Sequence, residues 1–200
     1  PIRIPDEQAH VIDLSANANQ LVAGEIKADD AMREVNLKEL IRLGSGAAHI
    51  DGVPFTLSGK DGKRLVVTGE DWPGQSREIT GIPVNQRLTQ VAFLHTAMYV
   101  NASDAQPLGK YVIHYADGAS VSKPILNDRD IRDWWAPGHK VNSKAPLAAL
   151  TFTSSQHSEM AVYNCMWINP HPDKAIASID LVSEGNAVLC LLAITGQTVR

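Results

Sequence analysis

Two adjacent tryptophans in a charged segment are the side chains of this sequence best suited to bind a ligand. Trp134 and Trp135 follow Arg132 and Asp133, and a Pro-Gly pair closes the segment. Indole faces stack on sugar rings, while neighbouring polar groups hydrogen-bond to sugar hydroxyls. Adjacent side chains of an extended chain point to opposite faces, so one indole should point inward and one outward. The segment predicts either a sugar-stacking platform or a plug that closes one end of the fold.

A second candidate is the loop at residues 169–173, which reads Asn-Pro-His-Pro-Asp. Its two prolines restrict the backbone, so the His171 imidazole and the Asp173 carboxylate are held at a loop tip. Such a loop either binds a ligand or only locks the crossing between two strands. Trp72 is a further indole in a loop. The predicted ligand-binding set is therefore Trp72, Arg132, Asp133, Trp134, Trp135, His171 and Asp173.

Histidines give a weaker case for metal binding or catalysis. His95 and His114 lie in strand-like runs, and a symmetric loop between them would place both on one sheet face. No acidic residue is placed to complete a zinc site, so a hydrogen-bonded pair inside the fold is favoured. The chain lacks nucleophile-elbow, phosphate-loop and zinc-protease motifs. A hydrolase or metal enzyme would need convergence of His95, His114, Asp117, His171 and Asp173.

Carboxylates between strands raise the alternative of a structural calcium ion. Asp128, Asp130 and Asp133 are clustered, but their spacing matches no known calcium loop. Cys165 and Cys190 sit in apolar runs, which favours buried free thiols over a disulfide, although the sequence leaves the bridge open.

Composition indicates one globular domain and excludes some partners. Hydrophobic residues make up 44% and charged residues 20%, which allows a real core. The net charge of −4, with scattered Lys and Arg, provides no basic surface for nucleic acid. No apolar run is long enough for a membrane-spanning helix. The chain begins at Pro1 without a leader, so we expect residues 1–200 to be one domain excised from a larger protein, with 1–34 irregular or at an edge.

Short strands separated by turns account for most of the chain. Asp61-Gly62 and Asp117-Gly118 each lie between two strand-like runs, and Asp-Gly favours tight hairpin turns. These hairpins would join residues 53–58 to 63–68 and 111–116 to 120–126. Other expected strands are 10–14, 37–43, 88–100, 148–153, 160–168, 175–181 and 188–195. At most one turn of helix is expected, at 29–34. Roughly ten or eleven strands predict an all-β antiparallel sandwich of the jelly-roll kind.

Alternation predicts which strands are covered on both faces. In residues 175–181, apolar Ala175, Ala177, Ile179 and Leu181 alternate with polar positions, which is typical of a strand with one wet face. Residues 188–194 are apolar on both faces and predict a central strand. Trp167 alternates with Tyr163 and Cys165, so it is expected in the core.

Several segments in a fixed order carry a family resemblance. They are Ile-Pro-Val-Asn at 82–85, Phe-Leu-His at 93–95, Gly-Lys-Tyr-Val-Ile-His-Tyr-Ala-Asp-Gly at 109–118, Asp-Trp-Trp at 133–135, Trp-Ile-Asn-Pro-His-Pro-Asp at 167–173, Ile-Ala-Ser-Ile-Asp at 176–180 and Leu-Ala-Ile-Thr at 192–195. Over roughly residues 35–195, the chain resembles the galactose-binding-like jelly-roll modules of bacterial glycoside hydrolases and related polysaccharide-degrading enzymes. Before residue 35 it departs from that pattern.

The resemblance implies a noncatalytic carbohydrate-binding accessory module of an exported bacterial protein, secreted, periplasmic or at the cell surface. Its expected partners are a glycan and the catalytic domain of the parent enzyme, and its expected cofactor is at most a structural calcium ion. The alternative is a purely structural spacer between domains. In that case the tryptophans would be buried or would lie in an interdomain contact.

Overall fold

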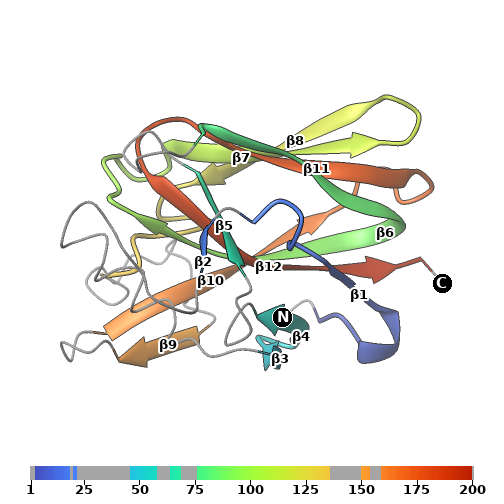
Figure 1. The fold of residues 1–200 in the computed structure, drawn as a ribbon, viewed down its shortest axis with the longest axis horizontal. Helices are drawn as coiled ribbons and strands as arrows, with labels where there is room; N and C mark the ends of the chain where they lie inside the picture. The colour runs from blue at the N-terminus through green and yellow to red at the C-terminus, as the bar shows by residue number, and fades with distance from the viewer. Residues whose placement is uncertain are drawn as a thin grey trace.

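Antiparallel strands form most of the described structure. The computed structural model describes residues 3–18, 20–21, 46–57, 64–68, 76–135, 150–153 and 159–199. These residues form a short 3-10 turn, η1, and the strands shown in Figure 1. The bounds are η1 Asp6–Gln8, β1 Ala9–Ile12, β2 Gln20–Leu21, β3 Gly46–Ile50, β4 Val53–Leu57, β5 Arg64–Thr68, β6 Glu78–Met98, β7 Pro107–Tyr115, β8 Ser120–Leu126, β9 Leu150–Thr153, β10 Glu159–Ile168, β11 Ala175–Ser183 and β12 Val188–Thr198. The predicted all-β antiparallel sandwich is confirmed. The helical turn expected at 29–34, the strand at 37–43 and Trp72 lie outside the described residues.

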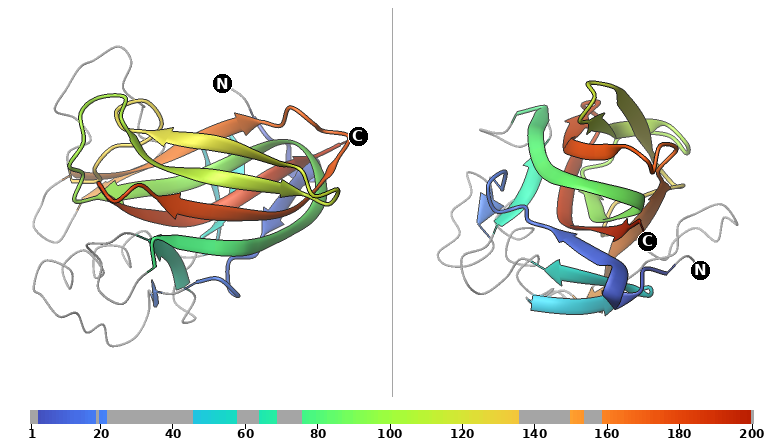
Figure 2. Two further views of the ribbon diagram at one scale, coloured as in Figure 1. Left: turned by 90° about the horizontal axis from the view of Figure 1, so that it is seen from above. Right: turned by 90° about the vertical axis from the view of Figure 1, so that its right-hand side faces the viewer.

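One very long strand, β6, joins the two layers of the sandwich (Figures 1 and 2). Its first half pairs with β11, which continues through β7 to β8. Its second half pairs with β12 on one side and β10 on the other. The sequence predicted only the second half. Register shifts in the first half fall beside Gly81 and Asn85, which both have positive φ, and these bulges bend the strand from one layer into the other.

Two apolar clusters hold three layers together. The first lies between the layers of the sandwich and includes Trp167, as expected, together with Phe93 and Tyr111. The second lies on the outer face of β12, β6 and β10, where Phe55 and other side chains of the β3–β4 hairpin cover it. Figure 2 (right) shows this hairpin below the sandwich. Strand β12 is buried along both faces, which confirms the prediction of a central strand.

The β3–β4 hairpin corrects one strand pairing. Residues 53–58 were expected to pair with the strand after Asp61-Gly62, but Val53–Leu57 pairs with Gly46–Ile50 instead. Asp51 and Gly52 form the turn, and both have positive φ. Asp51-Gly52 is thus an Asp-Gly hairpin turn that was not predicted from the sequence, and Asp61-Gly62 lies outside the described residues. The second predicted hairpin, β7–β8 around Asp117-Gly118, is confirmed.

The wet face of β11 differs in detail from the predicted alternation. Ile179 and Leu181 are buried as expected, but Ala175 and Ala177 are half-buried and Ile176 is buried in their place. The cause is the register shift between Ile176 and Ser178, which moves the buried positions by one residue.

Gly109 on β7 sits where a side chain does not fit. An added Cβ would lie 2.3 Å from the backbone oxygen of Val182 on the neighbouring strand. We expect Gly109→Ala to lower the free energy of unfolding by about 1–3 kcal/mol, because the two strands must separate. Urea unfolding measures this effect. The control Ser122→Ala, at an exposed position of β8, should stay within about 0.5 kcal/mol of the parent protein, and an equally small effect of Gly109→Ala would contradict the packing.

Candidate functional site

The segment that contains the two tryptophans is hydrogen-bonded to β6 and β10, in the layer of the sandwich formed by β12, β10 and the second half of β6. The Trp134 amide donates to the Ala97 carbonyl on β6 at 2.9 Å, and the Ala161 amide on β10 donates to the Trp134 carbonyl at 3.0 Å. Asp133 also forms an isolated bridge with Ala97. Residues 133–134 are therefore held like a short added strand.

Burial corrects the role expected for Trp134. Its side chain is 0% exposed and belongs to the outer apolar cluster, so its indole offers no face to a glycan. Trp135 is half-buried and meets Trp134 edge-on, with ring centroids 6.0 Å apart. One indole does point further inward than the other, as predicted. Trp134 fits the plug interpretation, whereas Trp135 keeps part of its surface exposed.

The side chains of Arg132 and Asp133 stabilise the segment that contains the two tryptophans. Arg132 is buried, and its Nε donates to the equally buried Asp128 carboxylate. Asp133 accepts backbone hydrogen bonds from Val100 at 3.2 Å and Trp135 at 3.0 Å. Burial raises the pKa of the Asp133 carboxyl, and the backbone donors oppose that shift. The geometry therefore assigns both side chains to holding the segment, and the expected direct contact of buried Arg132 with a ligand is not supported.

His95 lies inside the first apolar cluster rather than beside His114. Its Nδ1 is 2.8 Å from the Tyr111 hydroxyl, and its Nε2 is 3.3 Å from the Asp130 carbonyl oxygen. Because a carbonyl only accepts, Nε2 carries the proton and Nδ1 accepts from Tyr111. Burial lowers the pKa of His95 to about 4, so the imidazole is neutral at pH 7.

His114 points to the opposite, outer face of β7. It alternates with the buried Ile113 and Tyr115, and its Nε2 is 2.7 Å from Asp180 Oδ2 on β11. Asp180 Oδ1 accepts from the Gly81 amide at 2.8 Å. The expected placement of His95 and His114 on one face is therefore wrong. His95 contacts Tyr111 on the inner face of β7, whereas His114, three residues further along the same strand, projects from its outer face. The hydrolase or metal set built on both histidines does not converge.

The carboxylates considered for calcium are engaged elsewhere. Asp130 Oδ2 lies 3.0 Å from Lys123 Nζ and accepts the Leu126 amide at 2.9 Å. Asp128 pairs with Arg132, and Asp133 accepts the backbone donors named above. Within the described parts of the chain, no three His, Cys, Asp or Glu side chains are grouped to hold a metal ion. A structural calcium ion stays a prediction.

The two cysteines lie on opposite faces of the same layer. Cys165 belongs to the cluster between the layers, and Cys190 belongs to the outer cluster. Both are buried free thiols, as expected, and their placement leaves no route to a disulfide. Burial raises the pKa of Cys165 to about 11 and also raises that of Cys190.

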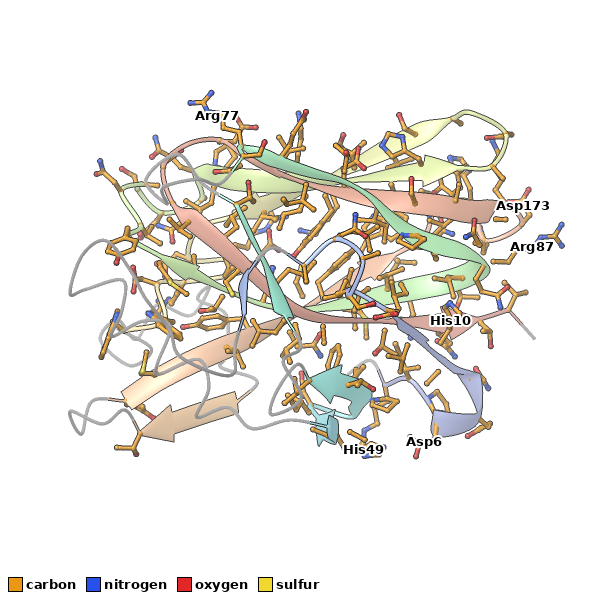
Figure 3. All side chains as sticks on the ribbon, viewed as in Figure 1. Asp6, His10, His49, Arg77, Arg87 and Asp173 are labelled. Atoms are coloured by element: carbon orange, nitrogen blue, oxygen red, sulfur yellow. The ribbon has the colours of Figure 1, made fainter. Side chains whose placement is uncertain are left out.

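The loop at 169–173 is rigid and its tip is exposed. Asn169 is buried and anchors it: its amide donates to the Thr89 carbonyl, and its Nδ2 donates to the carbonyls of Leu88 and His171. Its Oδ1 accepts from the Tyr115 hydroxyl at 2.6 Å and from the His171 amide at 2.9 Å. His171 and Asp173 themselves are exposed, and Figure 3 shows Asp173 at one end of the molecule.

The predicted set divides between two ends of the sandwich. Asn169 is bonded to Thr89 and Trp134 to Ala97, both on β6. Eight residues of extended strand separate these positions by about 26 Å. Arg132, Asp133, Trp134 and Trp135 therefore cannot share one small site with His171 and Asp173. The sequence missed Asn169 and Tyr115 as the anchors of the exposed end. The one signal in the sequence was the asparagine that precedes the proline loop, because its side-chain amide can donate and accept hydrogen bonds at the same time.

These contacts define the chain as an all-β antiparallel sandwich with two distinct loop ends. Comparison with known protein families and with curated proteins finds no match. None of the helical structure in the described residues is long and apolar enough to span a membrane.

Proposed function

We propose that this chain is a noncatalytic carbohydrate-binding accessory module of an exported polysaccharide-degrading enzyme. The ordered segments that resemble galactose-binding-like modules support this function, and the antiparallel sandwich is compatible with it. The contact with glycan lies in the loop at 169–173, with His171 and Asp173 as hydrogen-bonding groups.

The observation that carries this choice of site is the Asn169 anchor. Five hydrogen bonds of one buried side chain and its amide fix the backbone around an exposed imidazole and carboxylate. A loop fixed before binding loses little conformational entropy when a ligand arrives. Weak binding of a short glycan, with a dissociation constant from micromolar to millimolar, corresponds to about 4–8 kcal/mol.

A glycan array followed by titration calorimetry tests the proposal. The parent protein should bind at least one polysaccharide. The double variant His171→Ala/Asp173→Asn should bind it at least about tenfold more weakly, because hydrogen bonds to charged groups contribute about 1.5–3 kcal/mol. The control Asp104→Asn changes an exposed carboxylate near the other end and should bind like the parent. A parent protein that binds no glycan contradicts the proposal.

A structural spacer is the second candidate, and the complete burial of Trp134 favours it. A spacer needs no exposed ligand loop, and its tryptophans close the fold. The same array separates the two functions, since a spacer binds no glycan.

A further inference from the structure

Two polar side chains, Lys174 and His171, contact the ring of Tyr115 at the exposed end, and two carboxylates lie in the adjoining segments 117–119 and 171–174. The Lys174 ammonium lies 5.8 Å from the ring centre, and the His171 ring meets it edge-on with centroids 5.6 Å apart. The carboxylates of Asp117 and Asp173 are close enough to add to the effect of burial in raising the pKa of Tyr115. The β7–β8 turn therefore contributes to the same surface as the loop at 169–173.

Lys174 and Asp117 form a fixed donor and acceptor pair on this surface. Lys174 Nζ lies 2.6 Å from Asp117 Oδ2, and the side chains are 34% and 49% exposed. Backbone contacts fix both residues: Asp117 Oδ1 accepts the Ala119 amide at 3.0 Å, and the Lys174 amide donates to the His171 carbonyl at 3.0 Å. The hydrogen bond from Lys174 lowers the pKa of Asp117, so this carboxylate is ionised at neutral pH.

This spacing matches two neighbouring hydroxyls of a sugar ring. Hydroxyl oxygens on adjacent ring carbons lie about one hydrogen-bond length, roughly 2.8 Å, apart. Each hydroxyl both donates and accepts. One can donate to the Asp117 carboxylate while its neighbour accepts from Lys174, without breaking the pair's own contact. A single isolated hydroxyl uses only half of this arrangement.

We infer that the exposed end selects neutral sugars with a free vicinal diol, through Asp117 and Lys174 beside His171 and Asp173. This inference rests on the proposed glycan-binding function. The four side chains carry two carboxylates and one ammonium, so the carboxylate of a uronic acid meets net negative charge here. Asp117 and Lys174 are thus specificity-determining residues of the site.

Four soluble polysaccharides test the inference by calorimetry: galactomannan, xylan, linear β-1,3-glucan and polygalacturonate. Units inside galactomannan and xylan carry vicinal diols, whereas those inside β-1,3-glucan do not. We expect binding of galactomannan or xylan, no binding of the other two, and loss of binding after periodate cleaves the diols and borohydride reduces the products. Lys174→Met and Asp117→Ala should each weaken binding about tenfold or more.

The outcomes separate this inference from the proposed function. Urea unfolding checks that the two variants are folded, and Asp104→Ala is the matched control, expected to bind like the parent. Glycan binding that survives periodate, or that both substitutions leave unchanged, overturns the diol inference while the glycan-binding function stands. Preference for polygalacturonate likewise overturns it. Absence of binding to every polysaccharide on the array overturns both.

Discussion

Replacing Arg132 with methionine is expected to lower the free energy of unfolding by about 3–5 kcal/mol. Arg132 and Asp128 are each about nine-tenths buried, and the guanidinium hydrogen-bonds to the carboxylate. The other oxygen of Asp128 is already buried without a hydrogen bond. Methionine fills most of the space but leaves the carboxylate charged and unpaired in the interior. Urea or thermal unfolding at pH 7 measures the loss.

A double variant shows whether the unpaired charge is the cause. Arg132→Met/Asp128→Asn removes both charges and should recover a large part of the lost stability, since the cost of one uncompensated buried charge disappears. If Arg132→Met instead leaves stability unchanged and abolishes glycan binding, Arg132 belongs to the ligand-binding set that the sequence predicted, and its structural role is wrong.

The second large effect is a loss of stability on acidification because of His95. Its pKa is about 4 in the folded protein and 6.5 in the unfolded chain. Between these values the unfolded chain binds the proton and the folded protein does not, so lowering the pH favours unfolding. The contribution is fully present above pH 6.5 and falls by about 3 kcal/mol as the pH drops to 4. Urea unfolding at several pH values between 4 and 7.5 measures it.

His95→Gln is the matched variant for this pH dependence. The glutamine side chain can accept from the Tyr111 hydroxyl and donate to the Asp130 carbonyl, as the imidazole does, but it does not titrate. The difference in unfolding free energy between parent and variant should therefore shrink or change sign as the pH falls from 6.5 to 4. A difference that stays constant over this range would show that His95 is not the buried neutral base described above.

The fold could be predicted largely because local patterns and tertiary structure agree. The apolar run at 188–194 and the Asp117-Gly118 turn specify a central strand and a hairpin without help from the rest of the chain. Local patterns give the wrong strand pairing where tertiary contacts determine it. Asp51-Gly52 and Asp61-Gly62 are equivalent local turn signals on either side of Val53–Leu57, and this strand pairs with Gly46–Ile50 in a hairpin that docks onto the outer apolar cluster.

The site was harder to predict because side-chain direction and distance depend on the assembled sheets. The local sequence does not indicate that Trp134 packs into an apolar cluster. It also does not indicate that Arg132 forms an ion pair with a buried carboxylate. Likewise, His171 and Trp135 are adjacent neither in sequence nor in space, and only the length of β6 places them at separate ends. The loop at 169–173 was recognised from its prolines, but its anchor, Asn169, needs Tyr115 from another strand.

Chemical-shift mapping by amide NMR tests most directly the central claim that one end binds glycan while the other is structural. The isotope-labelled protein would be titrated with the tightest-binding oligosaccharide found on the array. The largest shifts are predicted at residues 115–119 and 169–175, with residues 97–99 and 127–135 nearly unchanged. Shifts concentrated around Trp135 instead, with His171 and Asp173 unaffected, would contradict the account.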